Sequence, residues 1–229
     1  MRDIILKVKN LNVELEGEKI LEDLSFKIEK GEMLVILGPN GAGKTVLLKT
    51  LLGFLPYRGK IEWKRDVKIG YVPQRLAMKK EIPLTVKEFF KLKKEFSEKE
   101  LKEILNWMQI EKGILFRQIG EISSGQFQRI LVAFVLSGNP DVLLFDEPME
   151  GIDLRGQEAI YNLLEKLNKE KRLTMIMVSH DLNVVFKFAK KILCLNKKMF
   201  CYGSPKELIT PNSISKLYGQ KVKFYDHLH

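Results

Sequence analysis

The fold is decided by one stretch, Gly38-Pro39-Asn40-Gly41-Ala42-Gly43-Lys44-Thr45. This stretch fits G-x-x-x-x-G-K-[ST], and it lies between a predicted strand at residues 33–37 and a predicted helix at 44–52. Glycines let the backbone curl so that successive N–H groups point toward an anion, and the helix N-terminus adds positive charge. Lys44 can reach the β- and γ-phosphates, and the Thr45 hydroxyl can ligate Mg²⁺. The stretch therefore predicts a site for ATP and Mg²⁺.

Two carboxylates follow a second apolar strand at residues 142–145. They are Asp146 and Glu147. Because ligands of a parallel sheet gather at the carboxyl ends of its strands, we expect Asp146 beside the phosphate loop, where it can hold Mg²⁺ through water. Glu147 is the natural general base for an attacking water. In isolation the pair would indicate a strand-terminal turn, but after a phosphate loop the hydrolytic interpretation is favoured.

His180 follows another apolar run, residues 175–178. It could contact the γ-phosphate and orient the water, although a single histidine is more often structural. Ser179-His180-Asp181 also resembles a helix N-cap, and both interpretations can hold together.

The remaining pattern predicts an α/β body interrupted by helices. Further strands are expected at residues 4–8, 24–28, 61–63, 69–72 and 174–178, with a closing hairpin at 192–195 and 199–202. Capping-box patterns at Thr85 and Ser97 predict helices after each of them, and residues 124–136, 154–168 and 182–189 also read as helical. We therefore expect one domain over residues 1–229, with a core of about 1–83 and 139–229 and a helical subdomain of about 84–138.

Composition and charge limit the classes of function that this chain can have. The chain has 229 residues, of which 45% are hydrophobic and 30% charged, and its net charge is +10. Lysines alternate with glutamates, as in residues 91–100, which favours a solvated surface over a nucleic-acid or lipid-binding patch. Apolar runs are too short to cross a bilayer and the N-terminus lacks a secretory signal, so we expect a cytoplasmic chain. Cys194 and Cys201 lack metal-ligand spacing, and we expect them to be buried, reduced and inert.

The order of the motifs resembles the ATP-binding cassette family. Its Leu-Ser-Gly-Gly-Gln signature is similar to Ile122-Ser123-Ser124-Gly125-Gln126. The family order of phosphate loop, Gln74, signature, Asp146-Glu147 and His180 is present, and the resemblance covers essentially the whole chain. It implies a P-loop NTPase (RecA-like) core with an antiparallel β edge and an inserted helical subdomain.

The resemblance also implies a homodimer. Two cassettes would face each other head to tail, so that Ser123, Ser124, Gly125 and Gln126 of one copy close on the ATP held by the other. The positive end of the helix beginning there suits a γ-phosphate. Gln74 would sense the γ-phosphate, ligate Mg²⁺ and touch a membrane partner, and Asp153 would link the two sites.

Several segments are similar to zinc and manganese importer ATPases, namely residues 73–75, 82–85, 118–121, 146–153, 194–196, 202–209 and 217–219. This implies ATP hydrolysis coupled to import of a divalent metal, on the inner face of the cell membrane. The partners would be integral membrane permease subunits and, indirectly, an extracytoplasmic solute-binding protein. The chain offers no convincing cargo site of its own, because His227 and His229 lie in a terminal tail.

Four residues depart from the family pattern. Leu15 stands where an aromatic residue usually stacks on adenine, and Val46 replaces a hydroxyl residue that can bond the α-phosphate. Ser124 replaces the first signature glycine, and Phe134 stands where arginine is common. These changes predict slow or partner-dependent ATP hydrolysis.

Two other functions stay open. One is a cassette for another cargo, including an exporter. The other is a soluble non-transport cassette that acts on nucleic acid, which the net charge of +10 supports. The chain lacks the coiled-coil insertion or second cassette usual in such proteins, so direct nucleic-acid binding is not expected.

Overall fold

The computed structural model describes residues 3–74, 83–93, 95–147, 149, 152–179, 185–186, 188–209 and 217. The chain divides into two compact units, Met1–Val67 with Thr174–His229, and Lys68–Leu173. The helical subdomain expected at residues 84–138 falls inside the second unit, and its limits stay a prediction. No helix in the described part of the chain is both long and apolar enough to span a membrane.

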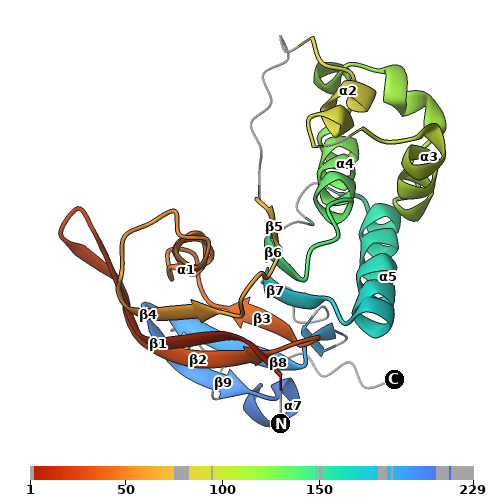
Figure 1. The fold of residues 1–229 in the computed structure, drawn as a ribbon. Helices are drawn as coiled ribbons and strands as arrows, with labels where there is room; N and C mark the ends of the chain where they lie inside the picture. Colours follow the sequence, from red (N-terminus) through yellow and green to blue (C-terminus); the bar gives the residue numbers. More distant parts are fainter. Residues whose placement is uncertain are drawn as a thin grey trace. The chain divides into compact units, whose positions relative to one another are not determined.

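The first unit contains a three-stranded antiparallel sheet in the order β2-β1-β4 (Figure 1). Its strands are β1 (Ile4–Leu15), β2 (Glu18–Glu29) and β4 (Arg58–Trp63). Both long strands extend beyond the predicted 4–8 and 24–28. The pairing register of β1 and β2 shifts near Asn10 and Asp23, whose φ values are 48° and 49°. Such bulges interrupt the alternation of buried and exposed side chains by which a strand is predicted from sequence.

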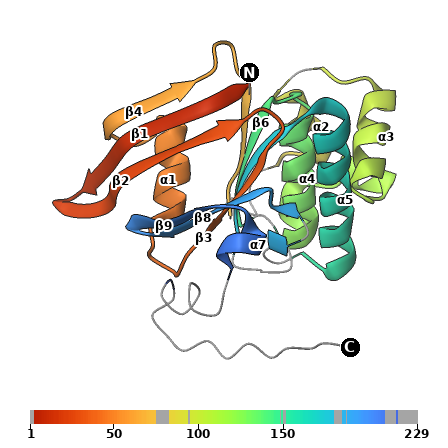
Figure 2. The ribbon, with the colours of Figure 1, turned by 90° about the horizontal axis from the view of Figure 1, so that it is seen from below.

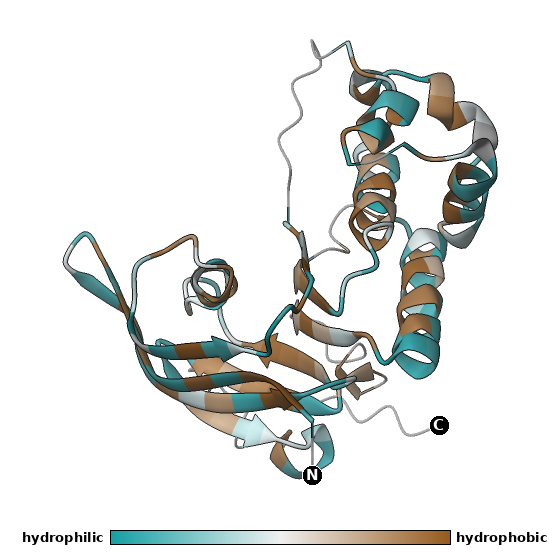
Figure 3. Ribbon diagram, viewed as in Figure 1, coloured by the Kyte–Doolittle hydropathy of each residue, from teal (hydrophilic) through white to brown (hydrophobic). Residues whose placement is uncertain are grey.

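Parallel strands in the same unit lie in the order β7-β3-β8, with β9 antiparallel at the edge. Their bounds are β3 (Met33–Leu37), β7 (Thr174–Val178), β8 (Lys191–Asn196) and β9 (Lys198–Gly203), followed by α7 (Pro205–Leu208). Every residue of β3 and β7 is buried, and β3 is continuously apolar in Figure 3. This central position fixes the end of β3, where the phosphate loop begins.

Helix α1 (Lys44–Leu51) follows the phosphate loop and lies beside the antiparallel sheet in both ribbon views (Figures 1 and 2). The indole Nε1 of Trp63 on β4 donates a hydrogen bond of 2.9 Å to the carbonyl oxygen of Leu51. This bond satisfies a carbonyl that the helix itself leaves without an intrahelical donor. The C-terminal end of α1 is thereby tied to the antiparallel sheet.

The second unit combines two parallel strands, β5 (Ile69–Val72) and β6 (Val142–Asp146), with helices. The helices are α2 (Val86–Lys91), α3 (Glu98–Trp107), α4 (Ser124–Leu136) and α5 (Leu154–Lys171), with 3₁₀ turns at Lys112–Phe116 and Ile119–Glu121. Both expected capping boxes are confirmed, because Thr85 and Ser97 each accept from the backbone three residues on. Phenylalanine rings join α2 to α4, the closest being Phe89 and Phe134 with centroids 4.5 Å apart.

The expectation of reduced cysteines is wrong for this structure. Cys194 on β8 and Cys201 on β9 form a disulfide, with their Cα atoms 4.8 Å apart. The two residues are direct partners in the antiparallel register, so their side chains face each other. The spacing of the two cysteines in the sequence does not reveal this pairing, because it depends on the register of the hairpin.

Candidate nucleotide-binding and hydrolysis site

The phosphate loop curls around the ammonium group of its own lysine. Lys44 is only 8% exposed, and its Nζ donates hydrogen bonds of 2.9 Å to the carbonyl oxygens of Gly38 and Pro39. Gly41 and Gly43 have φ values of 77° and 92°, a region in which side chains are strained. The loop thus presents a buried positive charge inside a ring of backbone, which suits a phosphate.

Neighbouring strands hold this loop in place. A Cβ on Gly38 would lie 2.0 Å from the Leu195 carbonyl oxygen on β8. Lys197 N, in the β8–β9 turn, donates a hydrogen bond of 3.1 Å to Ala42 O. A Cβ on Gly43 would meet the Leu21 side chain of β2 at 2.7 Å. The backbone therefore approaches other strands too closely for larger residues at two of its glycines.

The start of α1 provides the second anion-binding feature. Gly43 is the N-cap of this helix and has no side chain that could bond to the first N–H groups. These N–H groups are therefore not capped by the N-cap residue, and a helix N-terminus of this kind suits an anion. Asn40 and Gly41 are exposed, whereas Pro39, Thr45 and Val46 are half-buried. The backbone oxygen of Val46 accepts a bond of 2.7 Å from the Thr50 hydroxyl. Thr45 is the second residue of α1 and therefore lies in its first turn.

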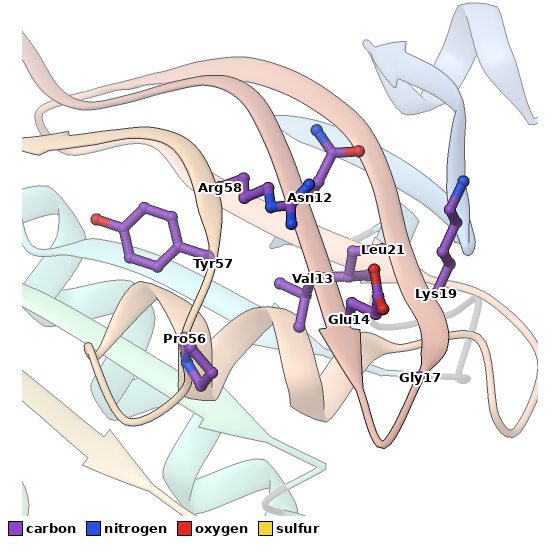
Figure 4. Close-up of a pocket in the computed structure, with 9 residues that line it drawn as sticks. All are labelled: Asn12, Val13, Glu14, Gly17, Lys19, Leu21, Pro56, Tyr57 and Arg58. Atoms are coloured by element: carbon purple, nitrogen blue, oxygen red, sulfur yellow. The ribbon is translucent and has the colours of Figure 1, made fainter.

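A cavity of about 650 Å³ lies beside the β1–β2 hairpin (Figure 4). Val13 and Leu21 come from the hairpin, and Pro56 and Tyr57 come from the connection into β4. The Leu21 side chain also lies close to Gly43, so it borders both the cavity and the phosphate loop. Leu15, half-buried at the end of β1, is not among its described lining residues. No sequence motif marks this cavity, because its lining residues come from separate strands and a connection.

The two carboxylates lie in the second unit at the end of β6. Asp146 is its last residue and is 3% exposed. Glu147 follows with φ 47°, a left-handed conformation that is uncommon for residues other than glycine. Gln74 Nε2 donates a hydrogen bond of 3.4 Å to Glu147 Oε2. The structure therefore brings together Gln74 and Glu147, which are distant in sequence.

Tyr71 is a neighbour of Asp146 that sequence reasoning missed. Burial, the charge of Asp146 and a hydrogen bond to its carboxylate together raise the pKa of Tyr71 to about 12. The phenol of Tyr71 therefore stays protonated at neutral pH. A signal was present in the sequence, since Tyr71 lies three residues before Gln74 in a predicted strand.

The signature residues form the first turn of α4. Ser123 is the N-cap, and its hydroxyl accepts a bond of 3.2 Å from Gln126 N, while Gln126 Oε1 accepts one of 3.0 Å from Ser123 N. Ser123 and Ser124 are exposed, and Gly125 is half-buried. The positive end of α4 is thus open at the surface of this unit. Further along the helix, Gln128 Nε2 donates to Pro73 O at 3.3 Å, which ties α4 to the segment carrying Gln74.

The predicted site residues fall into two groups. The phosphate loop and Leu15 belong to the first unit, and Gln74, Asp146, Glu147 and the signature belong to the second. His180 lies outside the described residues.

Comparison with known proteins gives consistent results. The family described as ABC transporter matches residues 21–150, which include the phosphate loop, the signature and both carboxylates. A probable metal transport system ATP-binding protein of Thermotoga maritima is 40% identical, over 93% of this chain and 90% of that protein. The zinc import ATP-binding protein ZnuC of Mannheimia succiniciproducens is 35% identical, over 98% of this chain and 87% of that protein.

Solved structures agree with this result. An inward-facing conformation of an ABC transporter assigned to the metal-chelate type matches with a TM-score of 0.82 and 27% identity, over 94% of this chain and 89% of that chain. The dimeric post-hydrolysis state of the ATP-binding cassette MJ0796, bound to ADP and Pi, matches with a TM-score of 0.74 and 28% identity, over 87% of this chain and 98% of that chain. These matches confirm the expected P-loop α/β fold.

Proposed function

The chain belongs to the ABC transporter family as an ATP-hydrolysing subunit, and we propose that it powers import of a divalent metal, zinc or manganese, through a partner permease. The phosphate loop carries the nucleotide part of this proposal. Its buried Lys44 ammonium and left-handed glycines form a preorganised anion site at the start of α1. The names of the zinc and metal transport relatives support the cargo.

The candidate Mg²⁺ ligands are all oxygen donors. They are the Thr45 hydroxyl, the Asp146 carboxylate and the side-chain amide oxygen of Gln74. Mg²⁺ prefers such hard ligands, and the Asp146 carboxylate is buried at the end of β6, so the donor set fits this ion. When bound, Mg²⁺ would offset the negative charge of the phosphates.

Each residue then has a defined task in hydrolysis. Lys44 and the N–H groups of the loop hold the β- and γ-phosphates. Glu147 accepts a proton from the attacking water, and Gln74, already bonded to Glu147, orients that carboxylate and senses the γ-phosphate. His180 is assigned to contact the γ-phosphate and to orient the attacking water. Leu15 would cover the adenine without an aromatic ring, and Val46 leaves the α-phosphate to backbone N–H groups.

A second copy completes the site in this proposal. Ser123 and Ser124 are exposed at the positive end of α4, where they can meet the γ-phosphate bound by another chain. The ADP- and Pi-bound dimer of a related cassette supports this arrangement. Binding of ATP would close the dimer, and hydrolysis would release it.

Transport itself requires partners. In the described residues, no group of three or more His, Cys, Asp or Glu side chains could hold a metal ion. We therefore assign cargo binding to integral membrane permease subunits and to an extracytoplasmic solute-binding protein. The chain would act at the cytoplasmic face of the membrane, where ATP is available.

Substitution of the proposed base tests the mechanism. Glu147→Gln should lower ATP turnover by roughly 10²–10⁴-fold, because the amide cannot accept the proton, while ATP-driven dimers accumulate in size-exclusion chromatography. Glu158→Gln, on the exposed side of α5, is the matched control and should leave turnover unchanged. Unchanged turnover in Glu147→Gln would show that the base is another residue. Zinc-stimulated ATP hydrolysis by the chain reconstituted with its permease then tests the cargo.

A further inference from the structure

The hairpin of β8 and β9 contains a bulge directly beside its disulfide. Cys194 pairs with Cys201, but the next pair is Leu195 with Met199, so the register passes over Phe200, which is 58% exposed. A bulge of this kind interrupts the ladder of hydrogen bonds between two strands. The disulfide therefore joins β8 and β9 at the point where their backbone pairing is interrupted.

The end of the hairpin beyond this bulge contacts the phosphate loop. Lys197, in the turn between the strands, donates its N–H to Ala42 O over 3.1 Å, and its carbonyl oxygen accepts a hydrogen bond of 2.8 Å from Glu22 N of β2. The Leu195 carbonyl oxygen would lie 2.0 Å from a Cβ on Gly38. All of these residues belong to the first unit. A shift of the hairpin would therefore move backbone groups that touch the phosphate loop directly.

The two cysteines differ in their exposure. Cys194 is 6% exposed, whereas Cys201 is half-buried on β9, which lies at the edge of the sheet. Thiol–disulfide exchange begins when a thiolate attacks one sulfur of a disulfide, and access to that sulfur helps to decide the rate. We therefore expect a small thiol to attack Cys201 Sγ first.

We propose that the disulfide between Cys194 and Cys201 is a redox switch for ATP binding, in which the oxidised hairpin holds the phosphate loop in the shape that accepts phosphates. The proposal rests on the function proposed above, because it needs an ATP site at the phosphate loop. A chain at the cytoplasmic face would meet a pool of small thiols, and disulfides in that compartment are usually transient or redox-sensing. Reduction releases the hairpin beyond the bulge and lowers the affinity for ATP.

The reducing agent is a low-molecular-weight thiol, of which two molecules are consumed. The thiolate of the first attacks Cys201 Sγ, the bond between the two cysteine sulfurs breaks, and Cys194 leaves as a thiolate that takes up a proton. The second thiol attacks the sulfur that the first one contributed, which releases Cys201 as a thiol and forms the disulfide of the small thiol. The protein gains two electrons and two protons, and both small thiols are oxidised.

The test measures ATP affinity against the redox state of the hairpin. The purified chain is equilibrated in glutathione buffers that range from oxidising to reducing, and the fraction of disulfide is determined by alkylation of free thiols and mass spectrometry. The affinity of each sample for a fluorescent ATP analogue is then measured with Mg²⁺. Coupling between two sites typically changes affinity by about 5–150-fold. Full reduction should therefore weaken ATP binding by about 5-fold or more.

Thermodynamic linkage adds a second expected result. If the disulfide strengthens ATP binding, bound ATP must favour the disulfide by the same factor. Saturating ATP should therefore lower the equilibrium constant for reduction by glutathione by about 5-fold or more. A disulfide that only stabilised the fold, without affecting the phosphate loop, would give no such shift.

Single-cysteine variants provide the controls. The chain contains two cysteines, so Cys201→Ser cannot form the internal disulfide. This variant should bind ATP like the reduced wild type at every glutathione ratio, and Cys194→Ser should behave in the same way. Non-reducing electrophoresis shows whether the wild-type disulfide lies within one chain. Thermal unfolding without nucleotide shows whether each variant and the reduced wild type are folded.

The outcomes distinguish this proposal from the one on which it rests. Equal ATP affinities of the oxidised and reduced wild type would overturn the switch, and so would absence of the internal disulfide in the most oxidising buffer. Unfolding of the reduced chain would also overturn it, because the disulfide would then be a requirement of the fold. If neither the oxidised nor the reduced wild type binds ATP, the proposed function itself is wrong.

Discussion

Gly38→Ala tests whether strand β8 sets the shape of the phosphate loop. The new methyl group would lie 2.0 Å from the Leu195 carbonyl oxygen and 3.2 Å from the Ala42 Cβ. The first contact is with backbone, which cannot rotate away, so either the loop or β8 must move. Overpacking of this kind costs about 1–3 kcal/mol in unfolding free energy. For a chain of this size that corresponds to a fall in Tm of roughly 2–12 °C.

The assay combines thermal unfolding with ATP binding. Because the new methyl group would displace the phosphate loop, Gly38→Ala should also weaken ATP affinity. Gly113→Ala is the matched control, since a Cβ at Gly113 meets nothing within 4 Å. It should leave Tm unchanged or slightly higher. A Gly38→Ala protein with wild-type Tm and ATP affinity would refute the reasoning, because the approach of β8 would then not constrain the loop.

Two further predictions concern stability. Glu32→Gln removes a carboxylate that lies 2.7 Å from Lys191 Nζ and belongs to a residue that is only 4% exposed, so urea unfolding should show a loss of about 1.5–3 kcal/mol in unfolding free energy. Glu62→Gln, in the solvent-exposed pair with Lys60, is the control and should leave the unfolding free energy nearly unchanged. Reduction of the disulfide between β8 and β9 should lower the unfolding free energy by about 2 kcal/mol, which thermal unfolding with and without a reductant would measure. The same Tm in both conditions would show that the two cysteines are not joined in solution.

Local patterns were sufficient to predict the phosphate loop. Its glycines, Lys44 and Thr45 are contiguous, and the flanking strand and helix are short and strongly apolar. The signature turn was equally accessible, because Ser123 and Gln126 form a capping box within four residues. In both places the chemistry depends on neighbours in sequence.

Contacts between strands could not be predicted in the same way. The hydrogen bond of Gln74 to Glu147 and the proximity of Tyr71 to Asp146 bring together residues more than 70 positions apart, and both depend on the register of β5 against β6. The disulfide was missed for the same reason, since it depends on the pairing of β8 with β9. Register is set by the packing of whole strands, which a single sequence does not specify.

The distribution of tryptophan has a practical consequence. The chain contains two, and one lies in each compact unit: Trp63 is bonded to the end of α1, and Trp107 is 44% exposed at the end of α3. Replacing either with phenylalanine leaves a single fluorophore as a local spectroscopic probe. Coincident emission changes from the two single-tryptophan proteins during denaturation would indicate cooperative melting, and separate midpoints would indicate autonomous folding of the two units.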